Sequence, residues 1–149
     1  MNLSQIENRI PNFYDKPIIL VNFPQIDSQK AMTTIKHRMA IQKAIEIIEA
    51  KMQDLPTLGE LASLSGLSRT YFSQVFKETT GMKLQEYITE VRFKKAENLL
   101  SNIDLKIKEV AYEIGFGDPN YFSRTFKRKM GLNPTNWRVK KLLKSGNRN

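Results

Sequence analysis

The sequence has no cysteine and only one histidine, His37, among its 149 residues. The absence of cysteine excludes disulfides, thiolate metal sites and cysteine nucleophiles. One histidine leaves almost no material for histidine-based catalysis, and we expect His37 to be solvated and without a partner. No glycine-rich phosphate loop is present. We therefore expect no enzyme activity, no catalytic residue, no cofactor and no metal site.

Long apolar runs are also lacking. No run approaches about 18 consecutive apolar residues, which excludes a membrane-spanning helix. The N-terminus shows no basic stretch followed by an apolar one, so we expect no secretory signal and a cytoplasmic protein. Hydrophobic residues still make up 40% of the chain, enough to bury the core of one compact domain or of two very small ones.

Acidic residues are scarce relative to basic ones. The chain has 24 Lys and Arg against 15 Asp and Glu, which leaves a net charge of +9. A chain this basic is attracted to polyanions such as nucleic acid or an anionic membrane surface. The excess is uneven, because residues 1–37 and 38–101 each have a net charge of +1 while residues 102–149 reach +7.

Residues 1–37 differ from the rest. Pro11, Pro17 and Pro24 interrupt them, and their one apolar run is Ile18–Val21. A lone strand there would not be stable by itself. We expect residues 1–37 to be an arm or linker, the remnant of an upstream domain, which favours a fragment of a longer protein over a stand-alone chain.

From residue 38 onward the pattern predicts helices and no strands, so we expect an all-α fold. Cap residues and helix breaks define the expected elements. They predict a helix with an apolar stripe from Ile41 to Ile48, helices that follow Thr57 and Ser68, a longer helix over roughly 84–101, and helices that follow Lys106, Asp118 and Asn133.

One segment occurs twice. Residues 66–77 align with residues 115–127 through a shared Tyr-Phe-Ser-x-x-Phe-Lys, with one extra residue in the second turn. Gly81 matches Gly131, and Tyr87 matches Trp137. Each copy has the layout of a helix-turn-helix, two helices joined by a short glycine-containing turn. We expect units over 38–82 and 103–149, joined by a central helix over 83–102.

The second helix of each copy has one apolar and one polar face. We expect the apolar face to be buried, with Phe72, Val75 and Phe76 in the first copy and Phe122 and Phe126 in the second. The polar positions, spaced i, i+3, i+4 and i+7, are Thr70, Ser73, Gln74 and Lys77 in the first copy and Asn120, Ser123, Arg124 and Lys127 in the second. Neither set of four includes an acid, which favours an anionic partner. Arg reads guanine, and Asn or Gln reads adenine, in the major groove of DNA.

These motifs resemble the DNA-binding domain of the AraC/XylS family of bacterial transcription regulators over about residues 38–140. The signature reads Ile107-x-x-Val110-Ala111, Gly115-Phe116-x-Asp118-x-x-Tyr121-Phe122-Ser123-x-x-Phe126-Lys127 and Gly131-x-x-Pro134-x-x-Trp137-Arg138, and the central helix matches at Arg92, Ala96 and Leu99-Leu100. The resemblance implies about seven helices, with two recognition helices in adjacent major grooves. A central helix of about 18 residues spans about 27 Å, comparable to the roughly 34 Å between successive grooves.

The resemblance also implies roles for particular residues and partners. The implied base readers are Thr70, Ser73, Gln74, Asn120, Ser123 and Arg124. The implied phosphate contacts are Arg69, Lys77, Lys127 and Arg128, assisted by the helix N-termini near Thr57 and Lys108. Pro119 has no N–H to donate, so Asn120 is expected to contribute more. An activator, associated with the nucleoid and touching RNA polymerase, is favoured over a repressor, and any effector is expected to bind a domain absent from this chain.

One alternative stays open. The helix pairs, or the basic tail residues Arg138, Lys140, Lys141 and Lys144, would serve equally in a module that binds a partner protein, RNA or a membrane surface. Such a module more often places apolar anchors on its exposed helix face than polar side chains. If DNA is the partner, the two units are unequal: the second, with Arg124 and most of the net charge, anchors the chain.

Overall fold

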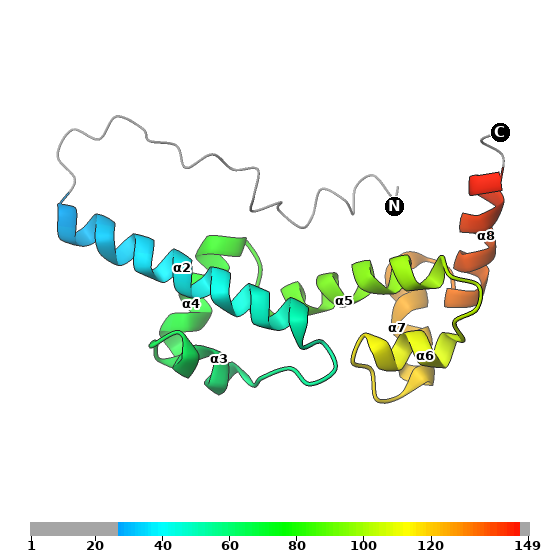
Figure 1. The fold of residues 1–149 in the computed structure, drawn as a ribbon, viewed down its shortest axis with the longest axis horizontal. Coiled ribbons are helices and arrows are strands. Elements are labelled where there is room, and N and C mark those ends of the chain that lie inside the picture. The colour runs from blue at the N-terminus through cyan, green and yellow to red at the C-terminus, as the bar shows by residue number, and fades with distance from the viewer. Residues whose placement is uncertain (1–26, 147–149) are drawn as a thin grey trace. The chain divides into compact units, whose positions relative to one another are not determined.

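The computed structural model describes residues 27–146, and all of the secondary structure in that range is helical (Figure 1). The seven helices are α2 (Ser28–Ala50), α3 (Leu58–Leu64), α4 (Arg69–Thr80), α5 (Leu84–Leu100), α6 (Ile107–Glu113), α7 (Pro119–Met130) and α8 (Pro134–Gly146). The predicted all-α class is thus confirmed. The prolines and the apolar run of the expected arm lie outside the described residues.

Helix α2 begins ten residues earlier than the sequence pattern predicted. The carboxylate of Asp27 accepts a hydrogen bond from the backbone N–H of Gln29 at 3.1 Å, as an N-cap residue does. The hydroxyls of Thr33 and Thr34 donate to the carbonyls of the preceding turn. Assigning residues 28–37 to the arm was therefore wrong. The apolar side chains of this segment do not face the core, so they contributed nothing to the expected stripe.

The chain separates into two compact units. The first combines α2 with residues 56–87, and the second combines residues 51–55 with residues 88–146. Helix α5 begins in the first unit and ends in the second.

The first unit is built around the packing of α2 and α3 on α4. Its fully buried side chains include Ile41, Leu61, Phe72 and Phe76. The Thr57 hydroxyl and the Glu60 carboxylate form a reciprocal capping box at the start of α3. Ser68 caps α4, which ends at Gly81 in the left-handed conformation. The boundaries of α3 and α4 are therefore set by local hydrogen bonds of cap residues that can be identified in the sequence.

Aromatic rings form the core of the second unit. Phe93, Phe122 and Phe126 are buried together, with Phe126 also lying edge-on to Trp137 at 6.0 Å between ring centroids. The guanidinium of Arg138 donates to the carbonyls of Leu100 and Leu105 at 2.9 and 2.7 Å. This arginine, named above both in the signature and among the basic tail residues, thus ties α8 to the end of α5 and to the loop that follows.

The segment that connects α2 to α3 belongs to the second unit. Met52 is buried there, and its carbonyl oxygen lies only 2.1 Å from where a Cβ on Gly115 would stand. Arg92 donates to the same oxygen at 3.4 Å, and the Gln53 amide donates to Glu113 at 2.9 Å. Gly115 also has a φ of +83°. Glycine is therefore required there both for the backbone conformation and for the close approach.

Candidate nucleic-acid interface

Two helix-turn-helix pairs are present, α3 with α4 and α6 with α7, and both contacts are internal to their units. In each pair a buried alanine, Ala62 or Ala111, and the buried phenylalanines of the second helix form the packed face. The predicted burial of these aromatic side chains is confirmed. The remaining face of α4 and of α7 is left for solvent or a partner.

On α4 the predicted base readers lie on the outward face. Thr70, Gln74 and Lys77 are exposed, whereas Ser73 is half-buried. The Ser73 hydroxyl donates to the carbonyl of Arg69 at 3.0 Å. This hydrogen bond uses the one donor of the hydroxyl and leaves only its acceptor lone pairs. Ser73 is therefore a weaker candidate reader than its neighbours.

An acid follows directly on this face of α4. Glu78 stands one turn beyond Gln74, and the Gln74 side-chain amide donates to its carboxylate at 2.9 Å. The outward face is thus free of acids as far as Lys77 but not to the end of the helix.

On α7 the outward face is polar in the first turn and basic from Arg124 onward. Asn120, Arg124, Lys127 and Arg128 are exposed, and Ser123 is half-buried. Among the described residues, the side chains of Arg124 and Lys127 have no hydrogen-bond or ion-pair partner. Asp118 caps the helix by accepting from the Asn120 backbone N–H at 2.8 Å, which leaves the Asn120 side chain available. The Arg124 guanidinium is therefore ready to meet an external acceptor.

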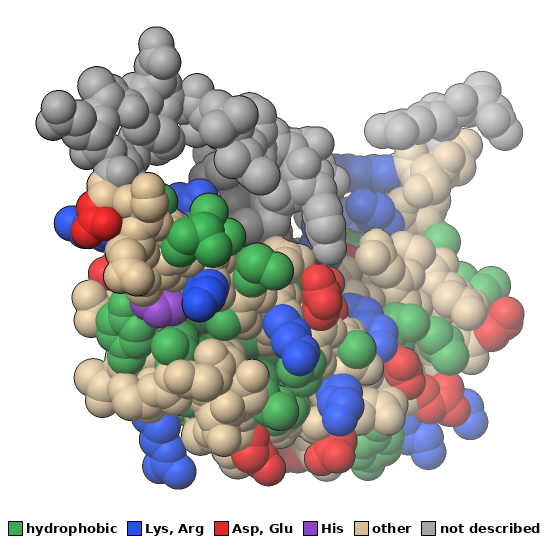
Figure 2. Space-filling view, turned by 60° about the vertical axis from the view of Figure 1, so that its left-hand side comes forward, with side chains coloured by type: hydrophobic (Ala, Val, Ile, Leu, Met, Phe, Trp, Pro, Cys, Tyr) green, Lys and Arg blue, Asp and Glu red, His purple; other side chains and the backbone are tan. Residues whose placement is uncertain are grey.

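The two outward faces differ in charge. Helix α4 contains Arg69, Lys77 and Glu78, whereas α7 contains four basic residues and no acid. One of these four, Lys129, forms a close ion pair with the buried Glu90. Elsewhere on the surface, basic and acidic side chains are interspersed on the face that Figure 2 shows. On α7 itself, by contrast, no acid accompanies the basic side chains.

Arg69 lies across the first turn of α3. A Cβ on Gly59 would stand 2.7 Å from the Arg69 guanidinium, so a larger residue at 59 would displace it. Gly59 was not among the residues predicted from the sequence to matter for this site. A glycine in the first turn of a helix is a signal of close approach, but it does not say which side chain approaches.

The N-termini of the two short helices are occupied by carboxylates. The Glu60 carboxylate accepts from the Thr57 backbone N–H at 2.7 Å, and Glu109 accepts from that of Lys106 at 2.7 Å. Hydrogen bonds from the Thr57 backbone and hydroxyl lower the pKa of Glu60. A DNA phosphate at either of these helix N-termini would therefore be repelled by a carboxylate, which disfavours the predicted phosphate contacts there.

His37 has a partner, contrary to the expectation. The Tyr71 hydroxyl lies 3.2 Å from its Nδ1, and the two rings meet edge-on with centroids 5.1 Å apart. The pair joins α2 to α4, a contact that the sequence could not show because His37 was assigned to the arm. Glu113 of α6 forms an ion pair with Lys95 at 3.0 Å. No cluster of potential metal ligands occurs in residues 27–146.

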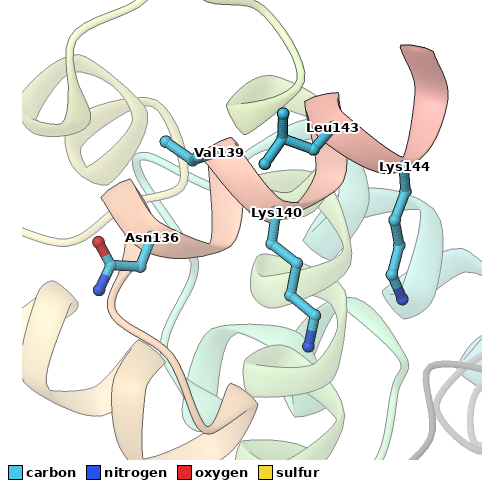
Figure 3. A pocket seen from close by; sticks show the side chains of 5 residues that line it. All are labelled: Asn136, Val139, Lys140, Leu143 and Lys144. Atoms are coloured by element: carbon cyan, nitrogen blue, oxygen red, sulfur yellow. The ribbon is translucent and has the colours of Figure 1, made fainter. Parts of the chain in front are cut away.

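Helix α8 offers a second exposed surface. Val139 and Leu143 are 51% and 69% exposed, and Figure 3 shows them with Asn136, Lys140 and Lys144 around a shallow pocket. Lys140 and Lys144 project from the same side of the helix (Figure 3). This surface combines apolar and basic groups, unlike the polar faces of α4 and α7. None of the described helices has the length and apolar character needed to cross a bilayer.

Comparison with known proteins agrees with this architecture. A family model described as a helix-turn-helix domain matches residues 61–140. The chain is 29% identical over 140 residues to the transcriptional activator Btr of Bacillus subtilis, an alignment that covers 83% of this chain and 26% of that protein. It spans only about a quarter to somewhat under half of the length of the curated relatives it matches.

Solved structures show the same fold. The C-terminal domain of the two-component response regulator yesN from Fusobacterium nucleatum is 36% identical, with a TM-score of 0.62, covering 67% of this chain and 98% of that domain. The DNA-binding domain of AdpA, solved in complex with a target DNA, is 26% identical with a TM-score of 0.65, covering 72% and 97%. Domains of this kind are not a class of enzymes. The chain belongs to the AraC family of helix-turn-helix transcription regulators, whose DNA-binding domain it contains.

Proposed function

We propose that the chain is the part of a bacterial transcription regulator that binds double-stranded DNA at specific sequences, and that this regulator is an activator. The single observation that supports this best is the outward face of α7, where Arg124 and Lys127 are exposed and unpaired on a helix without acids. The complex of AdpA with a target DNA supports the choice of partner.

In this proposal α4 and α7 are recognition helices that enter two major grooves. Their base readers are Thr70, Ser73 and Gln74 on α4 and Asn120, Ser123 and Arg124 on α7. Arg124 suits guanine, because a guanidinium matches its O6 and N7, and the amides suit adenine. The two half-sites lie about one helical turn apart, as for other paired helix-turn-helix units.

Four basic residues contact phosphates. Arg69 and Lys77 serve the first unit, and Lys127 and Arg128 serve the second. Phosphate contacts fix the position of a protein on the duplex, whereas contacts to base edges supply sequence preference. Because α7 carries more unpaired positive charge than α4, the second unit supplies the larger share of the binding free energy.

The remaining parts of the proposal concern the whole regulator. It acts in the cytoplasm on the nucleoid and contacts RNA polymerase while bound to DNA. The chain needs no cofactor or metal, and any effector binds a domain other than the two units described. The relatives' greater length leaves room for such a domain.

Selection of binding sites from a random duplex library, followed by titration at two salt concentrations, tests the proposal. We expect enrichment of two short half-sites about one turn apart, with a guanine in one of them, and affinity that falls steeply with salt. Inserting about five base pairs between the half-sites should abolish the joint binding. Recovery of no preferred sequence would contradict the proposal.

A protein-interaction module is the second candidate. The observation in its favour is the surface of α8, where Val139 and Leu143 are exposed beside two lysines. If this were the main function, Leu143→Glu would abolish partner binding, and Arg124→Ala would leave it intact. If DNA binding is the main function, Arg124→Ala weakens binding to a selected duplex, and Leu143→Glu leaves that binding intact.

A further inference from the structure

Glu78 is the one acidic residue of α4, and it lies where the second unit has a basic residue. The two recognition helices align with Tyr71 on Tyr121, so that Glu78 takes the position of Arg128. Glu78 is exposed and follows Gln74 by one helical turn. A carboxylate on a face proposed to bind DNA repels phosphates and lowers the affinity. The first unit therefore has an unfavourable charge at a position where the second unit has a favourable one.

Glu78 also forms a hydrogen bond with Gln74, one of the proposed base readers. The Gln74 Nε2 donates one N–H to the carboxylate at 2.9 Å. A glutamine amide has two N–H groups and a carbonyl oxygen, so one donor and the acceptor remain available. These are the two groups that adenine requires, since it presents N7 as an acceptor and N6 as a donor. The hydrogen bond thus leaves the reading edge of Gln74 free while holding the side chain.

Holding this side chain affects selectivity. Glutamine is long and flexible, and ordering one such side chain on binding costs about two- to tenfold in affinity. A side chain that is already ordered meets its preferred base without this loss. The charge of Glu78 acts on every sequence alike, because it repels phosphates within about 10 Å at moderate salt. The ordering of Gln74 therefore raises the preference for the adenine, whereas the charge lowers the affinity for every sequence and leaves that preference unchanged.

We propose that Glu78 is a positioning and specificity-determining residue of the first unit: it holds the Gln74 amide for adenine and weakens sequence-independent binding. This inference rests on the proposed DNA-binding function. It makes the first unit a selective but weak reader, in contrast to the second unit, where Arg128 adds attraction to phosphates.

Two substitutions separate the two effects. Glu78→Ala removes both the charge and the acceptor, whereas Glu78→Gln removes the charge and keeps a carbonyl that can accept the same hydrogen bond. The chain offers a matched control on α2, where Gln42 donates to Glu46 at 3.4 Å with the same four-residue spacing. Glu46→Ala and Glu46→Gln therefore repeat the chemistry on a helix that has no proposed role in base reading.

The measurement uses the full chain and three duplexes at low and high salt. They are the selected site, the same site with the adenine read by Gln74 replaced, and a scrambled sequence. Gln74→Ala identifies that adenine, as the position at which the variant loses preference. Circular dichroism checks that each variant is folded, which we expect because a glutamate in the last turns of a helix opposes the helix dipole.

We expect both Glu78 variants to bind the scrambled duplex about two- to fivefold more tightly at low salt, with the gain shrinking at high salt. Glu78→Ala should also lose about two- to tenfold of the preference for the adenine, whereas Glu78→Gln should retain most of it. The Glu46 variants should change neither quantity.

Three outcomes contradict the inference. Unchanged preference in Glu78→Ala overturns the positioning role, and unchanged scrambled-duplex affinity in both variants overturns the charge role. Equal changes in the Glu46 variants would make both effects nonspecific. If the unaltered chain shows no preferred sequence, the proposed function itself fails, a result distinguishable from the others because it precedes any substitution.

Discussion

The two helix-turn-helix units share their buried phenylalanines and differ at several outward positions. Phe72 and Phe76 of the first unit correspond to Phe122 and Phe126 of the second, and all four are completely buried. On the outward faces, Gln74 corresponds to Arg124 and Glu78 to Arg128. Packing tolerates few changes of volume, whereas an exposed helix face is free to vary. The repeat is therefore kept at the buried phenylalanines, whereas the outward face keeps Ser73 and Lys77 but changes at Gln74 and Glu78.

Removing one ring from each core tests whether the two units unfold separately, and this change has the largest expected effect. Phe126→Ala deletes a side chain in contact with Phe93, Phe122 and Trp137. We expect a loss of about 3–5 kcal/mol in the free energy of unfolding. Urea denaturation followed by the fluorescence of Trp137, the one tryptophan, measures the second unit selectively.

Phe76→Ala is the matched variant in the first unit. If the units unfold separately, it should lower the helical content seen by circular dichroism at intermediate urea and leave the Trp137 transition in place. If the Trp137 transition shifts as far as it does in Phe126→Ala, the two units unfold as one. The two cores would then not be independent units of stability.

Arg124→Ala should have the next largest effect. We expect it to cost about 1–3 kcal/mol on the selected site and to relax the preference at one base pair. Gln74→Ala should cost less, because a neutral amide loses less than a charged, bidentate guanidinium. Titrations of both variants on selected and scrambled duplexes measure this. An equal loss on the two duplexes for Arg124→Ala would remove it from the base readers.

Lys127→Ala tests the phosphate contacts. It should weaken binding to all sequences similarly and reduce the slope of log affinity against log salt by about one. Lys77→Ala should change the slope less, because Glu78 follows it on α4. Lys94→Ala, an exposed lysine on α5, serves as the control and should leave the slope unchanged. If Lys94→Ala reduces the slope as much as Lys127→Ala does, the change reflects the net charge of the chain and not a phosphate contact of Lys127.

The smallest expected effect concerns the N-terminal cap of α3. Because Thr57 lowers the pKa of Glu60 in the folded chain, the ionised carboxylate stabilises α3 above the ordinary glutamate pKa. This stabilisation is lost as the pH falls through the lowered value. Glu60→Gln should therefore reduce the dependence of stability on pH below about pH 4.5. Thermal unfolding between pH 3 and pH 7 measures it, and an unchanged profile would contradict the assignment.

Much of the fold followed from local patterns. Thr57, Ser68 and Asp118 marked the helix starts correctly, and Gly81 and Gly131 marked the ends of the recognition helices. The start of α2 was missed because Met32 and Ile35 point away from the core and blur the apolar period. The outward residues of α4 and α7 were found from spacing alone. The interaction of Gln74 with Glu78 was overlooked, although its four-residue spacing is visible in the sequence.

The sequence by itself determined the all-α class, the repeated helix-turn-helix and the buried and exposed faces of its helices. These depend on caps and periodicities within about a dozen residues. Only the tertiary structure decided that residues 51–55 join the second unit, that His37 meets Tyr71, and that Gly115 must accommodate the Met52 carbonyl. Each of these contacts joins residues tens of positions apart. Such pairs meet because the packing of buried faces brings them together, and no local preference of either residue specifies the other.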